Sequence, residues 1–155
     1  MDELLLSDHT ELQGKFLIFS VSEVDYGIDI GNVTEILGVQ HMTPVPNTPA
    51  YVRGITNIRG TVVPVVDLRM RFGLEETEYT ERTCTILISS GNMQIGLIVD
   101  AVEDVVQFSP EDLLPLPQGG VVEKNKYLKG IGKEAEGIKQ LIDIEKIFET
   151  GVPAL

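Results

Sequence analysis

The fold is decided by a stretch that occurs twice, FLIFSVSEVDYGIDIGNVTEIL at residues 16–37 and TILISSGNMQIGLIVDAVEDVV at residues 85–106. The two segments align without a gap and match at nearly every apolar position. A second pair follows in the same order, YVRGITNIRGTVVPVVDLRMRF at residues 51–72 and YLKGIGKEAEGIKQLIDIEKIF at residues 127–148. Because both blocks recur in the same order in each half, we infer an internal duplication.

The repeated segments have the composition of β-strands. Short apolar runs rich in β-branched residues are bounded by Gly, Asn and Pro, which favours strands over helices. The runs are Phe16–Val21, Tyr26–Ile30, Val62–Val66, Thr85–Ile88, Ile95–Val99 and Val102–Phe108. Asp67, Ser109 and Asp143 each precede a pattern typical of one or two helical turns. About five short strands in each half close most economically as a barrel, since closure leaves no unpaired edge. The sequence therefore predicts a mainly β fold of two tandem five-stranded β-barrels.

The duplication also sets the expected domain organisation. We expect one barrel at about residues 14–74 and the other at about residues 83–149, joined by a polar, glutamate-rich linker. Residues 1–13 and 150–155 are expected to be flexible tails. Each barrel alone has a small core, so the two should pack together, and the interface between them is a candidate groove.

Charge and hydropathy exclude several classes of function. The chain has 155 residues and a formal net charge of −12, from 24 acidic and 12 basic side chains. Such a protein repels phosphate backbones, so we expect no nucleic-acid partner. No stretch reaches the roughly 18 apolar residues of a membrane span, and the acidic start does not resemble a secretory signal. We therefore expect a cytoplasmic protein without direct membrane insertion.

Candidate catalytic groups are sparse. His9 and His41 lie in no catalytic signature, and Cys84 has no second thiol or histidine nearby for a disulfide or a metal site. The carboxylates around Asp100 could form an acid/base pair, but a solvated strand edge explains them better. The sequence contains no phosphate-binding loop motif. We therefore expect no enzymatic activity, no cofactor and no metal.

One charge pattern departs from the rest of the chain. All five arginines lie between residues 53 and 82, and residues 37–74 carry four arginines against Asp67 alone, a local charge of +3. Either these arginines pair with acids elsewhere on the surface, or they form a docking patch. Arg59 is the clearest candidate, because Asn57-Ile-Arg-Gly60 is typical of a tight turn that exposes its side chain. Its counterpart in the second repeat is Ala135, as expected if one copy alone serves a contact.

Several motifs together resemble the CheW family, the coupling proteins of bacterial chemotaxis. In chain order they are Y-G-I-D-I at 26–30, N-T-P-A-Y at 47–51, N-I-R-G at 57–60, T-V-V-P-V-V-D-L-R at 61–69 and G-L-I-V-D-A-V at 96–102. The resemblance covers about residues 14–149, with Ile58 in place of the usual leucine. It implies two five-stranded SH3-like barrels. It also implies a non-catalytic adaptor that joins the cytoplasmic tips of methyl-accepting chemoreceptors to the histidine kinase CheA.

The resemblance also implies binding residues. In the family, the helical receptor tip docks along the groove between the barrels, and barrel ends contact the regulatory domain of CheA through apolar residues. The residues that match positions implicated in receptor or kinase binding are Ile30, Val33, Glu35, Gly54, Arg59, Gly96, Val102 and Val105. Glu35 and Arg59 match a surface salt bridge. The alternative interpretation is a small-ligand or peptide-binding double barrel, such as a CheV-type scaffold fragment.

Overall fold

The computed structural model of the protein describes residues 13–116 and 126–149. Its elements, in chain order, are β1 (Lys15–Val21), β2 (Val24–Asp29), η1 (Ile30–Asn32), β3 (Val33–Gly38), β4 (Val52–Ile58), β5 (Thr61–Asp67), α2 (Leu68–Arg71), β6 (Cys84–Ser90), β7 (Met93–Val99), β8 (Ala101–Gln107), η2 (Pro110–Asp112), β9 (Leu113–Leu114), β10 (Leu128–Glu134), β11 (Gly137–Ile142) and α3 (Ile144–Glu149). The expected tails at residues 1–12 and 150–155 lie outside the described residues.

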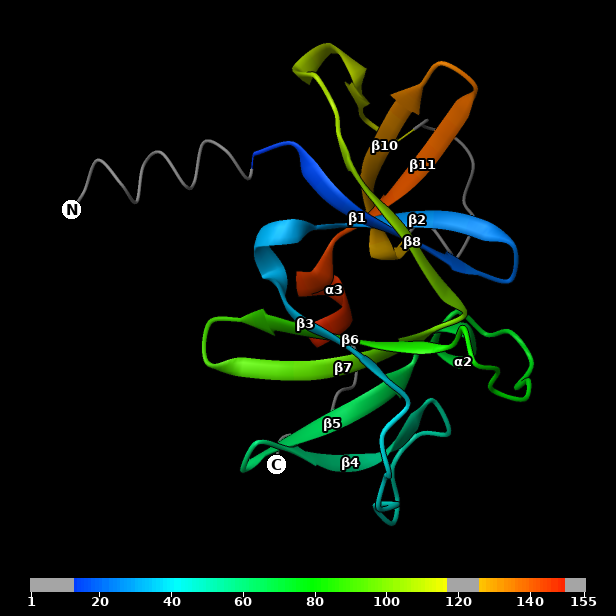
Figure 1. Cartoon of the computed structure of the whole chain (residues 1–155), viewed down its shortest axis with the longest axis vertical. Helices are drawn as coiled ribbons and strands as arrows, with labels where there is room; N and C mark the ends of the chain where they lie inside the picture. The colour runs from blue at the N-terminus through cyan, green and yellow to red at the C-terminus, as the bar shows by residue number, and fades with distance from the viewer. Residues whose placement is uncertain (1–12, 117–125, 150–155) are drawn as a thin grey trace, which may run out of the picture.

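The strands form two sheets, with α3 between them (Figure 1). One sheet has five strands in the order β3-β6-β7-β5-β4, and the other has six in the order β8-β1-β2-β11-β10-β9. The sixth strand, β9, has only two residues. Neighbouring strands are antiparallel except in the pairs β5–β7 and β2–β11, which are parallel. This architecture confirms the predicted mainly β fold of two SH3-like barrels with short helical turns.

Strand order and register confirm the internal duplication. Translated through the alignment of the repeats, the order β3-β6-β7-β5-β4 becomes β8-β1-β2-β11-β10, which is the order in the second sheet. The register is the same as well. Val65 pairs with Gly96 in the first parallel pair, and their equivalents Leu141 and Gly27 pair in the second. The two sheets are therefore copies of one arrangement.

Each sheet takes one hairpin from the opposite half of the chain. The β1–β2 hairpin lies in the sheet with β8, β10 and β11, and the β6–β7 hairpin lies in the sheet with β3, β4 and β5. The chain crosses between the sheets at η1 and again at Asp100, whose N–H donates to the carbonyl of Ser20 at 3.0 Å. This corrects the expected barrels of residues 14–74 and 83–149. The boundary at residues 74–83 separates the repeats. The first hairpin of each repeat belongs to the sheet that the other repeat's remaining strands form.

A shared core explains this exchange physically. Strand β1 is buried on both faces: Leu17 and Phe19 belong to the main core, whereas Phe16 and Ile18 pack with Phe108 in a smaller cluster. The main core also contains residues of the β6–β7 hairpin, α2 and α3. Each exchanged hairpin thus contributes one face to a core that joins the two sheets, which removes more apolar surface from water than two separate small barrels could.

The polar segment between the repeats is packed against the five-stranded sheet. The Tyr79 hydroxyl donates to buried Asp67 at 2.8 Å, and Arg53 forms an ion pair with Glu76 at 2.8 Å. Burial and the bond to Asp67 raise the pKa of the Tyr79 phenol above its ordinary value. Asp67 also accepts a hydrogen bond from the Met70 N–H at 3.3 Å, which caps α2 as predicted. The segment expected to be a linker is therefore held in place by side-chain contacts.

Candidate functional site

Arg59 and Glu35 form an ion pair between the two ends of the five-stranded sheet. Arg59 lies in the β4–β5 turn, and Glu35 lies on β3, so the pair joins elements from opposite ends of the strand order. The Nη1 atom of Arg59 donates to Oε1 of Glu35. A contact between terminal strands is what closure of a sheet into a barrel requires. The Arg59 side chain is 73% exposed and that of Glu35 is 25% exposed, so the carboxylate holds a guanidinium that faces solvent. The expected salt bridge is confirmed.

The backbone of this turn is strained at the arginine. Arg59 has a φ of +52° and Gly60 has a φ of +87°, and the flanking residues Ile58 and Thr61 pair with each other. A two-residue hairpin turn with positive φ at both central positions prefers Asn-Gly or Asp-Gly. Arginine carries a steric cost in the left-handed region. The turn therefore carries its arginine at a conformational cost that asparagine or glycine would largely avoid.

The ion pair shifts the titration of both partners. The hydrogen bond from Arg59 lowers the pKa of the Glu35 carboxyl, and the same bond raises the pKa of the Arg59 guanidinium. Because the folded-state pKa of Glu35 is depressed, the pairing is fully present above the ordinary glutamate pKa. It is lost as the pH falls through the folded-state value.

We expect an NMR titration of the Glu35 carboxyl to give a midpoint below the ordinary glutamate pKa. In the Arg59→Ala variant the midpoint should rise, because the guanidinium is the cause of the shift. The same midpoint in the wild type and the variant would contradict the pairing.

The apolar candidates lie along two edge strands, just after the crossovers between the sheets. Ile30 in η1, Val33 on β3 and Val102 on β8 are half-buried and pack against the main core. Val105 on β8 is 48% exposed, and its repeat equivalent on β3, Ile36, is 43% exposed. Strands β3 and β8 each end the order of their sheet. We call these five residues the edge-strand strip: Val33 and Ile36 lie on β3, Val102 and Val105 lie on β8 of the other sheet, and Ile30 comes just before β3.

Ile36 was not among the binding residues predicted from the sequence motifs. The alignment of the repeats could have identified it, because residue 36 is equivalent to residue 105. Exposed aliphatic residues recur at equivalent positions in both repeats, in the pairs Val24/Met93, Ile36/Val105 and Val62/Ile138. The duplicated fold therefore presents matching apolar positions on its two halves.

The two candidate glycines are buried in the five-stranded sheet. A Cβ added to Gly54 would lie 2.4 Å from the carbonyl oxygen of Thr43, and Gly54 has a φ of +147°. A Cβ added to Gly96 would lie 2.9 Å from Cγ2 of Thr85. Glycine at these positions lets neighbouring strands approach closely. Both glycines are therefore buried, tightly packed positions within the sheet.

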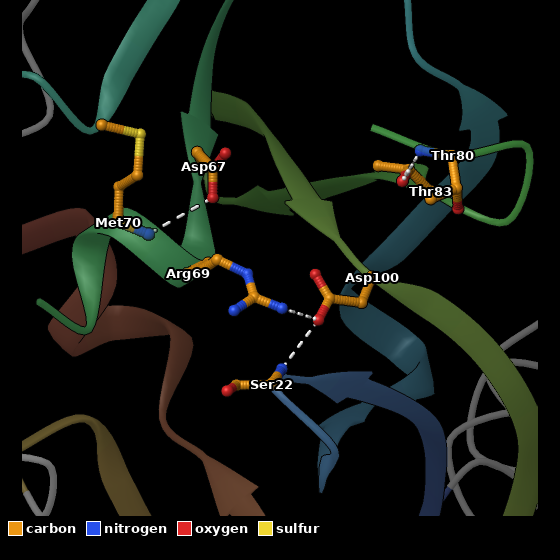
Figure 2. Close-up of polar contacts among 7 residues, drawn as sticks. All are labelled: Ser22, Asp67, Arg69, Met70, Thr80, Thr83 and Asp100. Atoms are coloured by element: carbon orange, nitrogen blue, oxygen red, sulfur yellow. Dashed lines mark hydrogen bonds and ion pairs between the residues drawn. The ribbon is translucent and has the colours of Figure 1, made fainter. Parts of the chain in front are cut away.

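Asp100 is an acceptor that joins the two sheets. Figure 2 shows its Oδ2 atom accepting from the backbone N–H of Ser22, at 2.7 Å, and from Nη2 of Arg69. Ser22 lies in the β1–β2 turn of the six-stranded sheet, and Arg69 lies in α2, which follows the last strand of the first repeat. The acidic residue considered above for acid/base chemistry thus takes part in an ion pair at the second crossover.

Replacing Asp100 by alanine should lower the free energy of unfolding by about 1–2 kcal/mol, because a guanidinium with little exposure loses its acceptor. Urea denaturation measures the change. The control is Asp104→Ala, at an exposed position of β8, which should stay within about 0.5 kcal/mol of the wild type. Equal losses in the two variants would contradict the structural role of Asp100.

Arg71 is held between aromatic rings. Its guanidinium carbon lies 4.4 Å from the ring centroid of Tyr51 and 4.8 Å from that of Tyr127, two tyrosines at equivalent repeat positions. Arg53 and Arg69 are tied to carboxylates, as described above. Of the four arginines in residues 37–74, Arg59 alone is exposed. The segment therefore presents one outward arginine and not a continuous basic patch.

The remaining candidate groups have structural contacts. Cys84 is half-buried, and its thiol donates to the carbonyl of Arg82 at 3.2 Å. His41 is exposed, and its backbone carbonyl accepts from the Thr56 hydroxyl at 2.8 Å, while His9 lies outside the described residues. Within residues 13–116 and 126–149, no three His, Cys, Asp or Glu side chains are placed to hold a metal ion. No helix in this part of the chain is long and apolar enough to cross a membrane.

The fold and the site together define a protein of the duplicated double-barrel class, with a charged turn that contacts the edge strand β3. The family model described as "CheW-like domain" matches residues 15–151. The chain belongs to this CheW-like family.

Similar proteins span most of the chain. The chain is 39% identical over 141 residues to "Chemotaxis protein CheW" of Klebsiella aerogenes, covering 91% of this chain and 85% of that protein. It is 30% identical over 139 residues to "Protein FrzA" of Myxococcus xanthus, covering 88% and 86%. Among solved structures, the scaffolding protein TtCheW from Thermoanaerobacter tengcongensis matches with a TM-score of 0.83 at 31% identity, covering 92% of this chain and 97% of that one. The resemblance recognised in the motifs is confirmed.

Proposed function

We propose that this protein is a non-catalytic adaptor that couples methyl-accepting chemoreceptors to the histidine kinase CheA. Its relatives include proteins named for chemotaxis, and the solved neighbour is described as a scaffolding protein. The observation that carries the proposal is Arg59, an exposed arginine in a strained turn, oriented by Glu35 on the neighbouring edge strand. This arrangement suits recognition of a protein partner, because arginine at an interface can bind carboxylates with defined geometry.

The receptor surface of the proposal combines this ion pair with the edge-strand strip. Glu35 lies on β3, the strand that also carries Val33 and Ile36 of the strip, whereas Val102 and Val105 lie on β8. The receptor tip is helical in the resembling family, and a helix can place an apolar stripe against such a surface with a carboxylate near Arg59. Gly54 and Gly96 lie buried in the same five-stranded sheet as the ion pair.

The proposed contact with CheA is apolar and lies at barrel ends. Two of the exposed aliphatic pairs, Val24/Met93 and Val62/Ile138, follow hairpin turns. They are available to a second partner while the receptor occupies the edge-strand strip. The proposal places the protein in the cytoplasm, recruited to receptor arrays through its partners and without a cofactor.

Calorimetric titration against the isolated regulatory domain of CheA from the same organism tests the kinase contact. We expect saturable one-to-one binding with a dissociation constant of about 1 μM or lower, a strength that interfaces of ordinary size reach. No detectable heat at several temperatures would contradict the contact. Thermal-shift screening would then test the small-ligand alternative, because a saturating ligand raises the melting temperature.

A further inference from the structure

The turn that carries Arg59 is closed by the side chain of Asn57. The Oδ1 atom of Asn57 accepts a hydrogen bond from the backbone N–H of Gly60 at 2.8 Å. Asn57 lies on β4, two residues before the arginine, and its backbone is paired with Val62 on β5. The amide therefore spans the turn and satisfies a donor of its second central residue.

We propose that Asn57 is a positioning residue, whose amide oxygen holds the β4–β5 turn in the left-handed conformation that directs Arg59 onto Glu35. The inference rests on the proposed function, in which Arg59 meets the receptor. The Arg59 side chain is 73% exposed, so little packing constrains its direction. The backbone conformation of the turn therefore sets the direction of the Arg59 side chain. The hydrogen bond to Asn57 holds that backbone conformation.

The second repeat offers an internal comparison for this role. At the equivalent β10–β11 turn, Lys133 replaces Asn57, Ala135 replaces Arg59 and Glu136 replaces Gly60. Ala135 and Glu136 do not have positive φ, in contrast to the two central residues of the β4–β5 turn. Of these two equivalent turns, the β4–β5 turn alone is left-handed. The β1–β2 turn also has positive φ at both central residues, Ser22 and Glu23, and there too a side-chain oxygen, Oδ2 of Asp100, accepts from a turn N–H.

The strain at Arg59 favours relaxation of the turn. An arginine in the left-handed region gains by relaxing to a turn of ordinary φ unless another interaction opposes the change. The hydrogen bond from Gly60 to Asn57 opposes it, because a relaxed turn moves that donor away from the amide oxygen. Without Asn57, the turn should populate other conformations, and the pairing between Arg59 and Glu35 should be formed for a smaller fraction of the time.

A double-mutant cycle tests the proposal, with binding to a soluble receptor-tip fragment as the readout. Asn57→Ala should weaken binding by about fivefold to tenfold in the wild-type background and by less than about twofold in the Arg59→Ala background. Asn57→Asp keeps an acceptor oxygen and should restore binding to within about threefold of the wild type. The matched control is Lys133→Ala, at the equivalent position of the other turn, which should leave binding unchanged.

The Glu35 titration is a second readout that does not depend on the receptor. Asn57→Ala should raise the pKa of Glu35 toward its value in Arg59→Ala. An unchanged Glu35 pKa, or a binding loss that persists in the Arg59→Ala background, overturns the proposal. If the wild type does not bind the receptor fragment, the proposed function fails, and the titration alone decides the role of Asn57. Asn57→Val, which suits a strand and lacks the acceptor, replaces the alanine variant if that variant is unfolded.

Discussion

Replacing Gly54 by alanine is expected to lower the free energy of unfolding by about 3 kcal/mol, because overpacking and a left-handed φ act together. The added methyl carbon would lie 2.4 Å from the carbonyl oxygen of Thr43 and 2.8 Å from its carbonyl carbon. Thr43 cannot easily move away, because it exchanges two backbone hydrogen bonds of 2.9 Å with Ile55. The clash is therefore between two pieces of backbone that neighbouring hydrogen bonds hold in place.

Urea denaturation of the Gly54→Ala variant measures this loss. Gly38→Ala is the matched control, because Gly38 lies on an exposed edge strand with no atom within 4 Å of an added Cβ. The control should change stability by less than about 0.5 kcal/mol. We also expect the remaining folded fraction of Gly54→Ala to bind the receptor tip, because Gly54 is buried and cannot touch a partner. A stable Gly54→Ala variant that has lost receptor binding would contradict the structural role.

Replacing Arg59 by glycine is expected to weaken binding to the receptor tip by roughly 30-fold, as for an arginine at the centre of an interface. The same variant should be at least as stable as the wild type, because glycine accepts the φ of +52° without steric cost. The exposed ion pair that is lost contributes little to folding. Binding and stability should therefore respond in opposite directions to one substitution.

Calorimetry with the receptor-tip fragment and a urea melt of the same sample measure both effects. Arg53→Ala is the control, because Arg53 belongs to the same arginine-rich segment but pairs with Glu76. This control should retain receptor binding. Wild-type affinity in Arg59→Gly would show that the exposed arginine is not part of the receptor contact.

The sequence predicts the repeated fold well, because apolar positions and turn residues recur in order in both halves. It does not predict the hairpin exchange directly, because the alignment is the same whichever sheet each hairpin joins. Two ion pairs between the hairpins depend on the exchange: Lys139 contacts Asp25 at 2.7 Å, and Lys129 contacts Asp29. Without exchange, Asp25 would face Val63, the repeat equivalent of Lys139, which is fully buried. A carboxylate facing a buried valine would lose solvation without gaining a partner.

The candidate site was partly predictable for similar reasons. Arg59 was identifiable from the local turn motif, and its partner Glu35 from the family resemblance. Whether the other arginines are paired or exposed depends on acidic residues distant in sequence. Asp100, for example, is brought near Arg69 by the tertiary structure alone. Ile36 was missed because an isoleucine in a strand normally signals a core position. Its exposure follows from its place on an edge strand.

The adaptor account is tested most directly by whether this protein makes CheA sediment with receptor-containing membranes. With the receptor and CheA of the same organism, we expect CheA to sediment with the membranes when the protein is present and to stay in solution when it is omitted. Arg59→Gly should fail to recruit CheA while still binding the isolated regulatory domain of the kinase. Sedimentation of CheA to the same extent with and without the protein would contradict the account.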